Sequence, residues 1–423
     1  MIFFFKPYRL LLISLFTLLV LSACSKKNKP SADNPEDESS ATGEKYGGGK
    51  ESFDLAEFKN QPICPGLVYI EGGKTTLGVL QEDFLFENDQ IERTVTVKSF
   101  YMDETEVANV HWKEYMFYLK RDSSEEIYNA AVPDTSCWSR ALSFNDAYVD
   151  HYFSYPGFRF YPVVGVSWKQ VIGFCAWRTE MVKMKLSGKS PAASGPKDSW
   201  RKQNFYQNTD AVKPKEEEKV EKPKNNQEEN SNEIPGYRLP TEDEWEYAAM
   251  AVIDVWAKDE NSQKRIYPWD GTNIRNPHNK KRGIFLANFK RGRGDYAGIA
   301  GQMNDGAMIT DYIYAYPPND FGLYNMSGNV NEWVYDKYKP KLLDKDPSID
   351  PNAPAEENPE NEEEKDDEYY TLLGSDVRVY KGGSWKDVAF WLTPGSRRFL
   401  EEDSSTATIG FRCAMDKLGG KGK

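Results

Sequence analysis

Histidine and cysteine are scarce in this chain of 423 residues. The three histidines, His111, His151 and His278, stand far apart, and the five cysteines form no Cys-x-x-Cys pair. Zinc and copper sites are usually built from several histidine or cysteine ligands that lie close together. The sequence therefore disfavours a zinc or copper site of this kind.

Positive charge is also in short supply, since the chain carries a formal net charge of -12. Such a chain repels nucleic acid and anionic lipid headgroups, so neither is expected as a main partner. The charge is compatible with cation binding or with a basic protein partner, although solubility alone is the simpler explanation.

Apolar residues are sparse in three segments: 25–50, 187–233 and the acidic stretch 341–368. Segments of this composition cannot bury enough apolar surface to fold, so the last two are predicted to be disordered insertions. Removing all three leaves roughly 300 residues, a common size for one domain. Aromatic residues make up 14% of the chain, enough for a large core. We therefore expect one domain over residues 61–416, followed by a tail, 417–423.

One long hydrophobic run, "LLLISLFTLLVLSA", lies near the N-terminus and is preceded by Lys6 and Arg9. It is too short for a comfortable membrane span and is typical of a signal peptide. The run ends in "LSAC", which resembles a bacterial lipobox. We therefore predict a signal peptide over residues 1–23, lipidation of Cys24 and a flexible tether over 24–60. An ordinary secretory signal is the alternative.

Local patterns indicate both strands and helices. The stretches "LVYIEGG" (67–73) and "TVTVKSFYM" (94–102) are β-branched and aromatic, as strands are. Three helices are predicted, the first capped by Asn109 and the second by Ser167. The third begins with a capping box of Thr241 and Glu244. Their expected buried faces are Trp112, Tyr115, Met116 and Leu119; Val171, Phe174 and Cys175; and Trp245, Ala248 and Ala249.

Elsewhere glycine, proline, asparagine and aspartate are dense, which predicts long irregular loops. The expected fold class is α+β with little regular structure.

Four ordered motifs carry a family resemblance: "YRLPTEDEWEYAA" (237–249), "FGLYNMSGNVNEW" (321–333), "VYKGGSW" (379–385) and "GFRC" (410–413). Together they resemble the formylglycine-generating enzyme, or sulfatase-modifying-factor, domain. The resemblance covers about residues 65–416, interrupted by the two insertions. It implies a compact α+β fold of the C-type-lectin-like class.

Further stretches, "FYMDETEVANV", "YPVVGVSW" and "NEWVYDKY", resemble the gliding-motility lipoproteins of Bacteroidota. The J type (GldJ) is most similar, and the K type (GldK, PorK) is the second choice. This resemblance implies a lipid-anchored subunit of the type IX secretion and gliding machinery, on the periplasmic face of the outer membrane. Its partners would be other subunits, of the GldK/PorK and GldN/PorN types, and the membrane would be contacted through the lipid alone.

The resemblance also locates a missing active site. Enzymes of the family use two copper(I)-binding cysteines shortly after the "GGS" turn, and these positions fall on Asp387 and close to Leu392. Soft thiolates suit copper(I), whereas a carboxylate suits it poorly and a leucine cannot bind it. No other cysteine lies between Trp333 and Cys413. We therefore expect neither copper nor the family's catalysis.

A disulfide between Cys175 and Cys413 is implied by the same family. A disulfide that closes a loop of that length would stabilise the folded chain by about 4 kcal/mol in the chain-entropy model. Cys64 and Cys137 are left to pair with each other or to stay free, and disulfides are permitted in an exported protein.

Two calcium sites are implied as well, since calcium prefers six to eight oxygen ligands from a flexible loop. The first would use side-chain oxygens of Asn325 and Glu332 and the carbonyls of Gly328 and Val330. The second would use Asn288, Phe289, Asp305 and Ala307, and its spacing fits the family pattern less well. The alternative is that these asparagines and glycines only form tight turns.

Three functions are compatible with the sequence. The first is a non-catalytic scaffold of the secretion and gliding machinery, and the second is an active periplasmic oxidase of the sulfatase-modifying kind. The third is a cleft that binds a peptide or a glycan. An acid–base hydrolase using Asp387, Glu332 or Glu244 is a weaker alternative, because acids on a charged protein are common.

Overall fold

The computed structural model describes residues 41–42, 45, 61–78, 92–141, 145–188, 234–251, 265–277, 282–290, 307–338 and 376–419. The chain divides into two units, and nearly all described residues belong to the second, Gln61–Lys224 with Asn232–Lys423. The predicted signal peptide, Cys24 and the acidic insertion 341–368 lie outside the described residues, as does most of the tether. Of the insertion 187–233, only Ser187 and Gly188 are described. No helix among these residues is long and apolar enough to cross a membrane.

The strands form three sheets. An antiparallel sheet has the order β1-β4-β10-β5, a hairpin joins β2 to β3, and a third sheet has the order β8-β7-β6-β9 with β6 parallel to β9. The strands are β1 Leu67–Ile70, β2 Gly73–Leu77, β3 Arg93–Val97, β4 Phe100–Asp103, β5 Tyr237–Arg238, β6 Asn331–Lys337, β7 Val377–Lys381, β8 Arg398–Glu401, β9 Ile409–Gly410 and β10 Ala414–Asp416. The three residues between β9 and β10 therefore carry the chain from the third sheet to the first.

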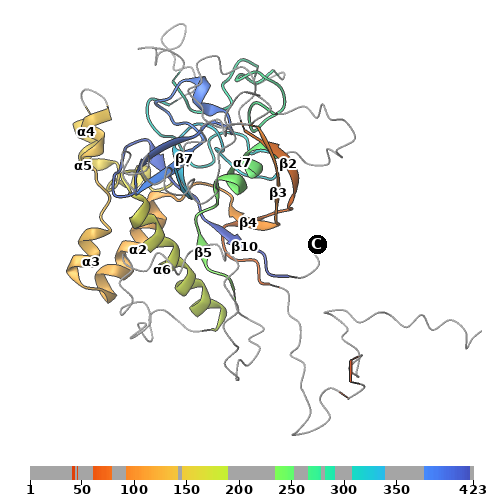
Figure 1. The fold of residues 1–423 in the computed structure, drawn as a ribbon. Coiled ribbons are helices and arrows are strands. Elements are labelled where there is room, and N and C mark those ends of the chain that lie inside the picture. Colours follow the sequence, from red (N-terminus) through yellow and green to blue (C-terminus); the bar gives the residue numbers. More distant parts are fainter. Residues whose placement is uncertain are drawn as a thin grey trace, which may run out of the picture. The chain divides into compact units, whose positions relative to one another are not determined.

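Helices cover the sheets from two directions. Helices α2 to α6 gather on one side, with α2 beside α6, whereas α7 lies next to β2 and β3 (Figure 1). The helices are α2 Asn109–Asp122, α3 Glu125–Ala130, α4 Cys137–Ala141, α5 Asp146–His151, α6 Trp168–Leu186 and α7 Glu242–Met250, with 3₁₀ turns at Pro156–Phe158 and Ala389–Leu392. This mixed content agrees with the α+β class expected from the sequence.

Two of the three predicted helix starts are confirmed. Ser167 accepts from the backbone N–H of Gln170, and Thr241 accepts from that of Glu244. The Asn109 cap was wrong by one residue, because Ala108 holds the N-cap position and Asn109 is already helical. The amide of Asn109 instead donates to the carbonyl of Phe158 at 3.0 Å, so this side chain ties α2 to the 3₁₀ turn. The buried faces predicted for the three helices are confirmed.

Each of the two predicted strand stretches is broken in the middle. The first ends as β1 and resumes as β2 at Gly73, and the second is interrupted at Lys98 and Ser99. Gly72 explains both breaks, because a Cβ there would lie 2.4 Å from the carbonyl oxygen of Val97 and 2.4 Å from the nitrogen of Ser99. The two chain segments cross closely at this corner, which only a residue without a side chain permits.

Aromatic side chains fill the core between α2 and α6. The rings of Trp112 and Phe174 stack with centroids 5.4 Å apart, and Phe411 packs edge-on against both. A second cluster surrounds Trp245 of α7 and lies against β1, β4, β6 and β7. Burying one large aromatic ring stabilises a core by about 1.5–3 kcal/mol, so these contacts account for much of the packing energy.

One buried ion pair joins the sheets. Arg412 lies between β9 and β10, and its Nε and Nη2 donate to the two carboxylate oxygens of Glu332 in β6 at 2.7 and 2.6 Å. Its remaining hydrogens reach the carbonyls of Asp103, Glu104 and Tyr324. Burial opposes the charge of Arg412, but the Glu332 carboxylate raises its pKa above the ordinary value. The third sheet and the end of β4 are thus held by one side chain.

Replacing this arginine is expected to be severely destabilising. In Arg412→Met the Glu332 carboxylate stays buried without its partner, which costs about 3–5 kcal/mol of unfolding free energy. The double variant Arg412→Met/Glu332→Gln should recover a measurable part of the lost unfolding free energy, because a neutral amide still accepts from the Trp245 indole. Urea unfolding of the three proteins measures both effects, and a loss below about 1 kcal/mol in the single variant would contradict the assigned role.

Candidate functional site

The "GGSW" turn is built around two glycines that other residues cannot replace without strain. Gly382 and Gly383 have φ of 98° and 70°. A Cβ on Gly383 would lie 2.8 Å from the carbonyl oxygen of Trp391 and 2.8 Å from Leu392. The turn is tied to the "NMSGN" loop, because the nitrogen of Gly328 donates to the carbonyl of Gly382 at 2.8 Å. The sequence motif thus marks a crowded, rigid corner.

Asp387 stands at the position to which the family resemblance assigns the first thiol. Both of its carboxylate oxygens accept from the guanidinium of Arg398 at 2.7 Å, and Ser384 and Asn331 donate to Oδ2. Burial opposes ionisation, but the hydrogen bonds and charge of Arg398 dominate and hold the pKa of Asp387 below its ordinary value. Arg398 in turn lies over the rings of Tyr380 and Trp391. The carboxylate is therefore a fixed anion in a planar pair.

Leu392, close to which the resemblance places the second thiol, is fully buried. It packs with Phe285, Ala287 and Phe289 in a small apolar cluster, and its carbonyl accepts from the hydroxyl of Ser327. Copper(I) prefers two soft thiolates in a near-linear arrangement. A paired carboxylate and a buried aliphatic side chain do not fit that ion.

The other acids weighed as proton donors are paired in the same way. Glu244 takes two hydrogen bonds of 2.7 Å from Arg238, and Glu332 is bound by Arg412. A general acid or base must reach a reacting group, and a carboxylate whose oxygens are occupied by a guanidinium is not placed to do so. The geometry therefore gives Asp387, Glu332 and Glu244 structural roles.

A buried charge cluster under the turn was missed from the sequence. The ammonium group of Lys381 is fully buried, 3.0 Å from Glu246 and 3.4 Å from Glu242. Arg397 also contacts Glu242, at 3.1 Å. Lys381 is well over a hundred residues from both acids along the sequence, so no local spacing predicts the contact. The cluster anchors the strand that leads into the "GGSW" turn to helix α7.

The first predicted calcium loop has a strained backbone and one unpartnered acceptor. Asn325 and Asn329 adopt positive φ of 54° and 64°, as asparagine tolerates better than most residues. The Oδ1 atom of Asn325 is buried and has no hydrogen-bond donor among the described residues. Such an acceptor is what a cation would complete, so the loop fits calcium at this residue.

The same loop faces a carboxylate that sequence reasoning missed. Glu106 is fully buried and accepts from the amides of Asn325 and Asn329 at 3.0 and 2.9 Å. Burial raises the pKa of Glu106 to about 8, with Arg412 opposing the shift and Glu332 adding to it. Glu106 and Glu332 thus present two acids to one guanidinium. A bound calcium ion would balance the excess of negative charge at these two acids, but it would share Glu332 with Arg412.

The second predicted calcium site cannot be assembled from the described residues. Asp305 lies outside them, and the amide of Asn288 donates to the carbonyl of Ile309 at 2.7 Å and to Asn329. Phe289 lies in the apolar cluster with Leu392, and Ala307 begins the next described segment. No group of three or more histidine, cysteine, aspartate or glutamate side chains suited to a metal occurs in the described ranges.

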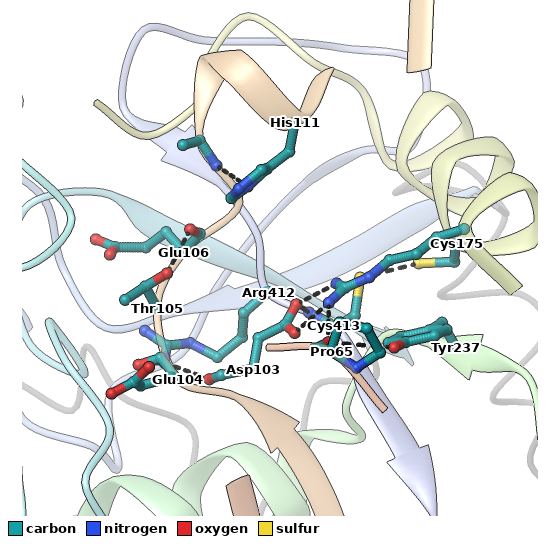
Figure 2. Close-up of polar contacts among 12 residues, drawn as sticks. Pro65, Asp103, Glu104, Thr105, Glu106, His111, Cys175, Tyr237, Arg412 and Cys413 are labelled. Atoms are coloured by element: carbon teal, nitrogen blue, oxygen red, sulfur yellow. Dashed lines mark hydrogen bonds and ion pairs between the residues drawn. The ribbon is translucent and has the colours of Figure 1, made fainter. Parts of the chain in front are cut away.

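Cys175 of α6 and Cys413 meet in the core. Their sulfur atoms lie 3.6 Å apart as thiols, and Figure 2 shows Cys413 beside Asp103 and Tyr237. The two side chains implied as a disulfide are therefore adjacent, and the covalent bond itself stays a prediction. Cys64 and Cys137 are also buried thiols, in different core clusters. Burial raises the pKa of both, to about 12 for Cys137, so neither is a reactive thiolate at neutral pH.

Comparison with known proteins gives a single family. The model described as "Sulfatase-modifying factor enzyme 1-like domain" matches residues 52–417. The formylglycine-generating enzyme of Mus musculus is 24% identical over 96% of this chain and 95% of its own length. The "Inactive C-alpha-formylglycine-generating enzyme 2" of Mus musculus is 25% identical over 83% of this chain and 85% of its own. Similar sequences thus carry both active and inactive names.

Solved structures show a weaker likeness. The PvdO structure from Pseudomonas aeruginosa has a TM-score of 0.44 and 18% identity, and covers 83% of this chain and 94% of its own. The Treponema denticola variable protein 1 has the same TM-score with 21% identity and the same coverage.

The Asp387–Arg398 pair makes a pH-dependent contribution to stability. Because the folded pKa is depressed, the contribution is complete above the unfolded pKa of about 3.9 and is lost as the pH falls through the folded pKa. Asp387→Asn should therefore be less stable than the unmodified chain at neutral pH, by about 1–3 kcal/mol. The gap should narrow below about pH 4. Urea midpoints across this range measure it, and a gap that widens in acid would contradict the pairing.

Proposed function

Because the chain belongs to the family of the sulfatase-modifying factor enzyme 1-like domain, we propose that it uses this fold as a non-catalytic scaffold. The observation that carries the proposal is the pair of thiol positions. One holds Asp387 bound to Arg398, and the other holds the buried Leu392. A relative named as inactive supports the idea that the fold exists without the reaction.

The scaffold is proposed to be a lipoprotein of the gliding-motility and type IX secretion machinery. Two sequence features support this role: the stretch ending at Cys24 resembles a lipobox, and the phrases "FYMDETEVANV" and "NEWVYDKY" resemble those of the GldJ group. The lipid would hold the domain on the periplasmic face of the outer membrane, and a tether would give it reach. Its partners would be subunits of the GldK/PorK and GldN/PorN types.

Calcium is proposed as a structural ion at the first loop only. Asn325, Gly328, Val330 and Glu332 would hold it, and the unpartnered Oδ1 of Asn325 supports this assignment. A bound calcium would order a loop that contains three residues with positive φ. It would supply charge neutralisation for Glu106 and Glu332 and no chemistry.

Metal binding separates the scaffold from the oxidase. The unmodified chain should take up no copper(I) tightly and should leave a cysteine-containing peptide unoxidised, because positions 387 and 392 offer no thiolate. Asp387→Cys/Leu392→Cys should gain copper(I) affinity, measured by competition with a chromophoric copper(I) chelator. Excess calcium should raise the melting temperature of the unmodified chain above that in excess chelator.

Asp387→Ser/Leu392→Ser is the matched control for the thiol variant, since it disturbs the same ion pair and core without providing sulfur. If the serine variant has the same melting temperature as the cysteine variant but binds no copper(I), the difference in binding comes from the thiols and not from a difference in folding. Copper-dependent oxidation of the peptide by the unmodified chain would refute the scaffold proposal in favour of the enzyme.

Membrane anchoring depends on one residue. Cys24→Ala should move the protein from the membrane to the soluble fraction, because a lipid chain provides about 0.8 kcal/mol per buried methylene. Capture of the anchored protein from its native envelope should recover other secretion subunits, identified by mass spectrometry. An unchanged fractionation of Cys24→Ala would rule out the anchor, and recovery of no such subunit would rule out the assembly role.

A further inference from the structure

A large cavity opens between α2, α6 and the segment after β4. Its volume is about 730 Å³, which lies in the range of ligand pockets. The segment contributes Asp103, Glu104, Thr105 and Glu106, and Figure 2 shows these residues in sequence below His111 of α2. Neither Asp387 nor Leu392 lines this cavity. It is therefore separate from the degenerate site, and a ligand could occupy it whether or not the family's catalysis is lost.

Aromatic rings form much of the wall. Tyr118, Phe174 and Trp177 contribute from the two helices, and Tyr314 contributes from a loop. Tyr314 continues into an exposed row, because its ring lies 5.6 Å from Tyr312 and that of Tyr312 lies 6.2 Å from Phe160. These three rings are 41%, 41% and 42% exposed. The cavity mouth thus leads onto a surface that suits an apolar stem or an extended chain.

Four acids line the cavity, Asp103, Glu104, Glu106 and Glu114, and two of them are satisfied by neighbouring side chains. Asp103 is neutralised by two hydrogen bonds from Arg178, at 2.6 and 2.8 Å, and Glu106 is held by buried amides. The carboxylates of Glu104 and Glu114 have no hydrogen bond or ion pair with any other described residue. Burial and then the charge of Glu104 raise the pKa of Tyr314, which places that carboxylate near the aromatic wall.

Lys185 also lines the cavity, and it is exposed. Lys185 follows Arg178 by seven residues on α6, about 10 Å along the helix axis. Lys185 therefore stands toward the end of α6, whereas Glu114 lies in α2 and Glu104 follows β4. A ligand that brings a cation to Glu104 and Glu114 therefore meets the opposite charge.

The wall also contains an unpartnered hydrogen-bond donor. Trp177 is only 6% exposed, and its buried indole N–H has no acceptor among the described residues. A buried donor without an acceptor destabilises the folded protein, and an acceptor on a ligand would recover that loss. Trp177 lines the cavity, so this unpartnered donor lies beside it, as do the carboxylates that would meet a cation.

We propose that this cavity binds a lysine or arginine side chain presented by an extended peptide of a partner protein. The cation lies by the carboxylates of Glu104 and Glu114, and its aliphatic stem lies along Tyr118 and Tyr314. A peptide carbonyl accepts from the Trp177 indole. A free alkylammonium ion would satisfy the acids alone, and a neutral sugar would leave them unpaired.

Calorimetric titration of the full chain with short synthetic peptides tests this site. A glycine-flanked lysine peptide should bind, and its affinity should fall with added salt. The same peptide with norleucine, which keeps the stem and removes the charge, should bind at least about tenfold more weakly. Equal affinity for the two peptides, tighter binding of a glutamate peptide or of a neutral oligosaccharide, or no binding of the lysine peptide would each overturn the proposal.

Three variants assign the contacts. Glu104→Gln/Glu114→Gln should weaken the lysine peptide about tenfold or more, whereas Glu126→Gln, an exposed acid on α3, should leave its affinity unchanged. Trp177→Phe keeps a ring and removes the N–H. It should weaken the peptide several-fold and leave the binding of butylammonium, which has no carbonyl, unaltered. Urea midpoints establish that each variant is folded, and an unaltered peptide affinity in folded Glu104→Gln/Glu114→Gln would refute the site.

Discussion

The fold depends on the contact between Arg412 and Glu332. Arg412 stands where the chain leaves β9 for β10, so its guanidinium lies where the third sheet passes into the first. It satisfies a buried carboxylate and three backbone carbonyls at once. Buried pairs of this kind are stable only when every hydrogen-bond partner is present. The backbone carbonyls of Glu104 and Tyr324 are two of these partners, so the pair also fixes the loops that carry them.

Local features could be predicted from the sequence, whereas long-range contacts could not. The caps at Ser167 and Thr241 depend on residues three positions apart, so a short window contains all the information. Glu332 and Arg412 are 80 residues apart, and Lys381 and Glu246 are 135 apart, so neither pair has a local signal. The Asn109 cap failed because the tertiary bond to the carbonyl of Phe158 outweighed the local preference.

The "GGSW" corner illustrates how architecture and chemistry separate. Its glycines are required by the approach of Trp391 and Leu392, whatever residue comes after the turn. Asp387 places a carboxylate at the position after that turn, and Arg398, Ser384 and Asn331 satisfy it through hydrogen bonds. The corner is thus held together by an ion pair of its own residues. A carboxylate whose lone pairs are occupied in this way gains stability and loses the freedom to bind a soft metal.

Two sets of acids among the described residues differ in their partners, and the difference bears on the proposed function. Asp387, Glu332 and Glu244 are each bound by an arginine, so their charge is neutralised inside the fold. Glu104 and Glu114 line an open cavity without such a partner. The proposed recognition of a cation would use these two carboxylates together with the aromatic rings beside them. The proposed scaffold would therefore select its partners through a surface other than the "GGSW" corner.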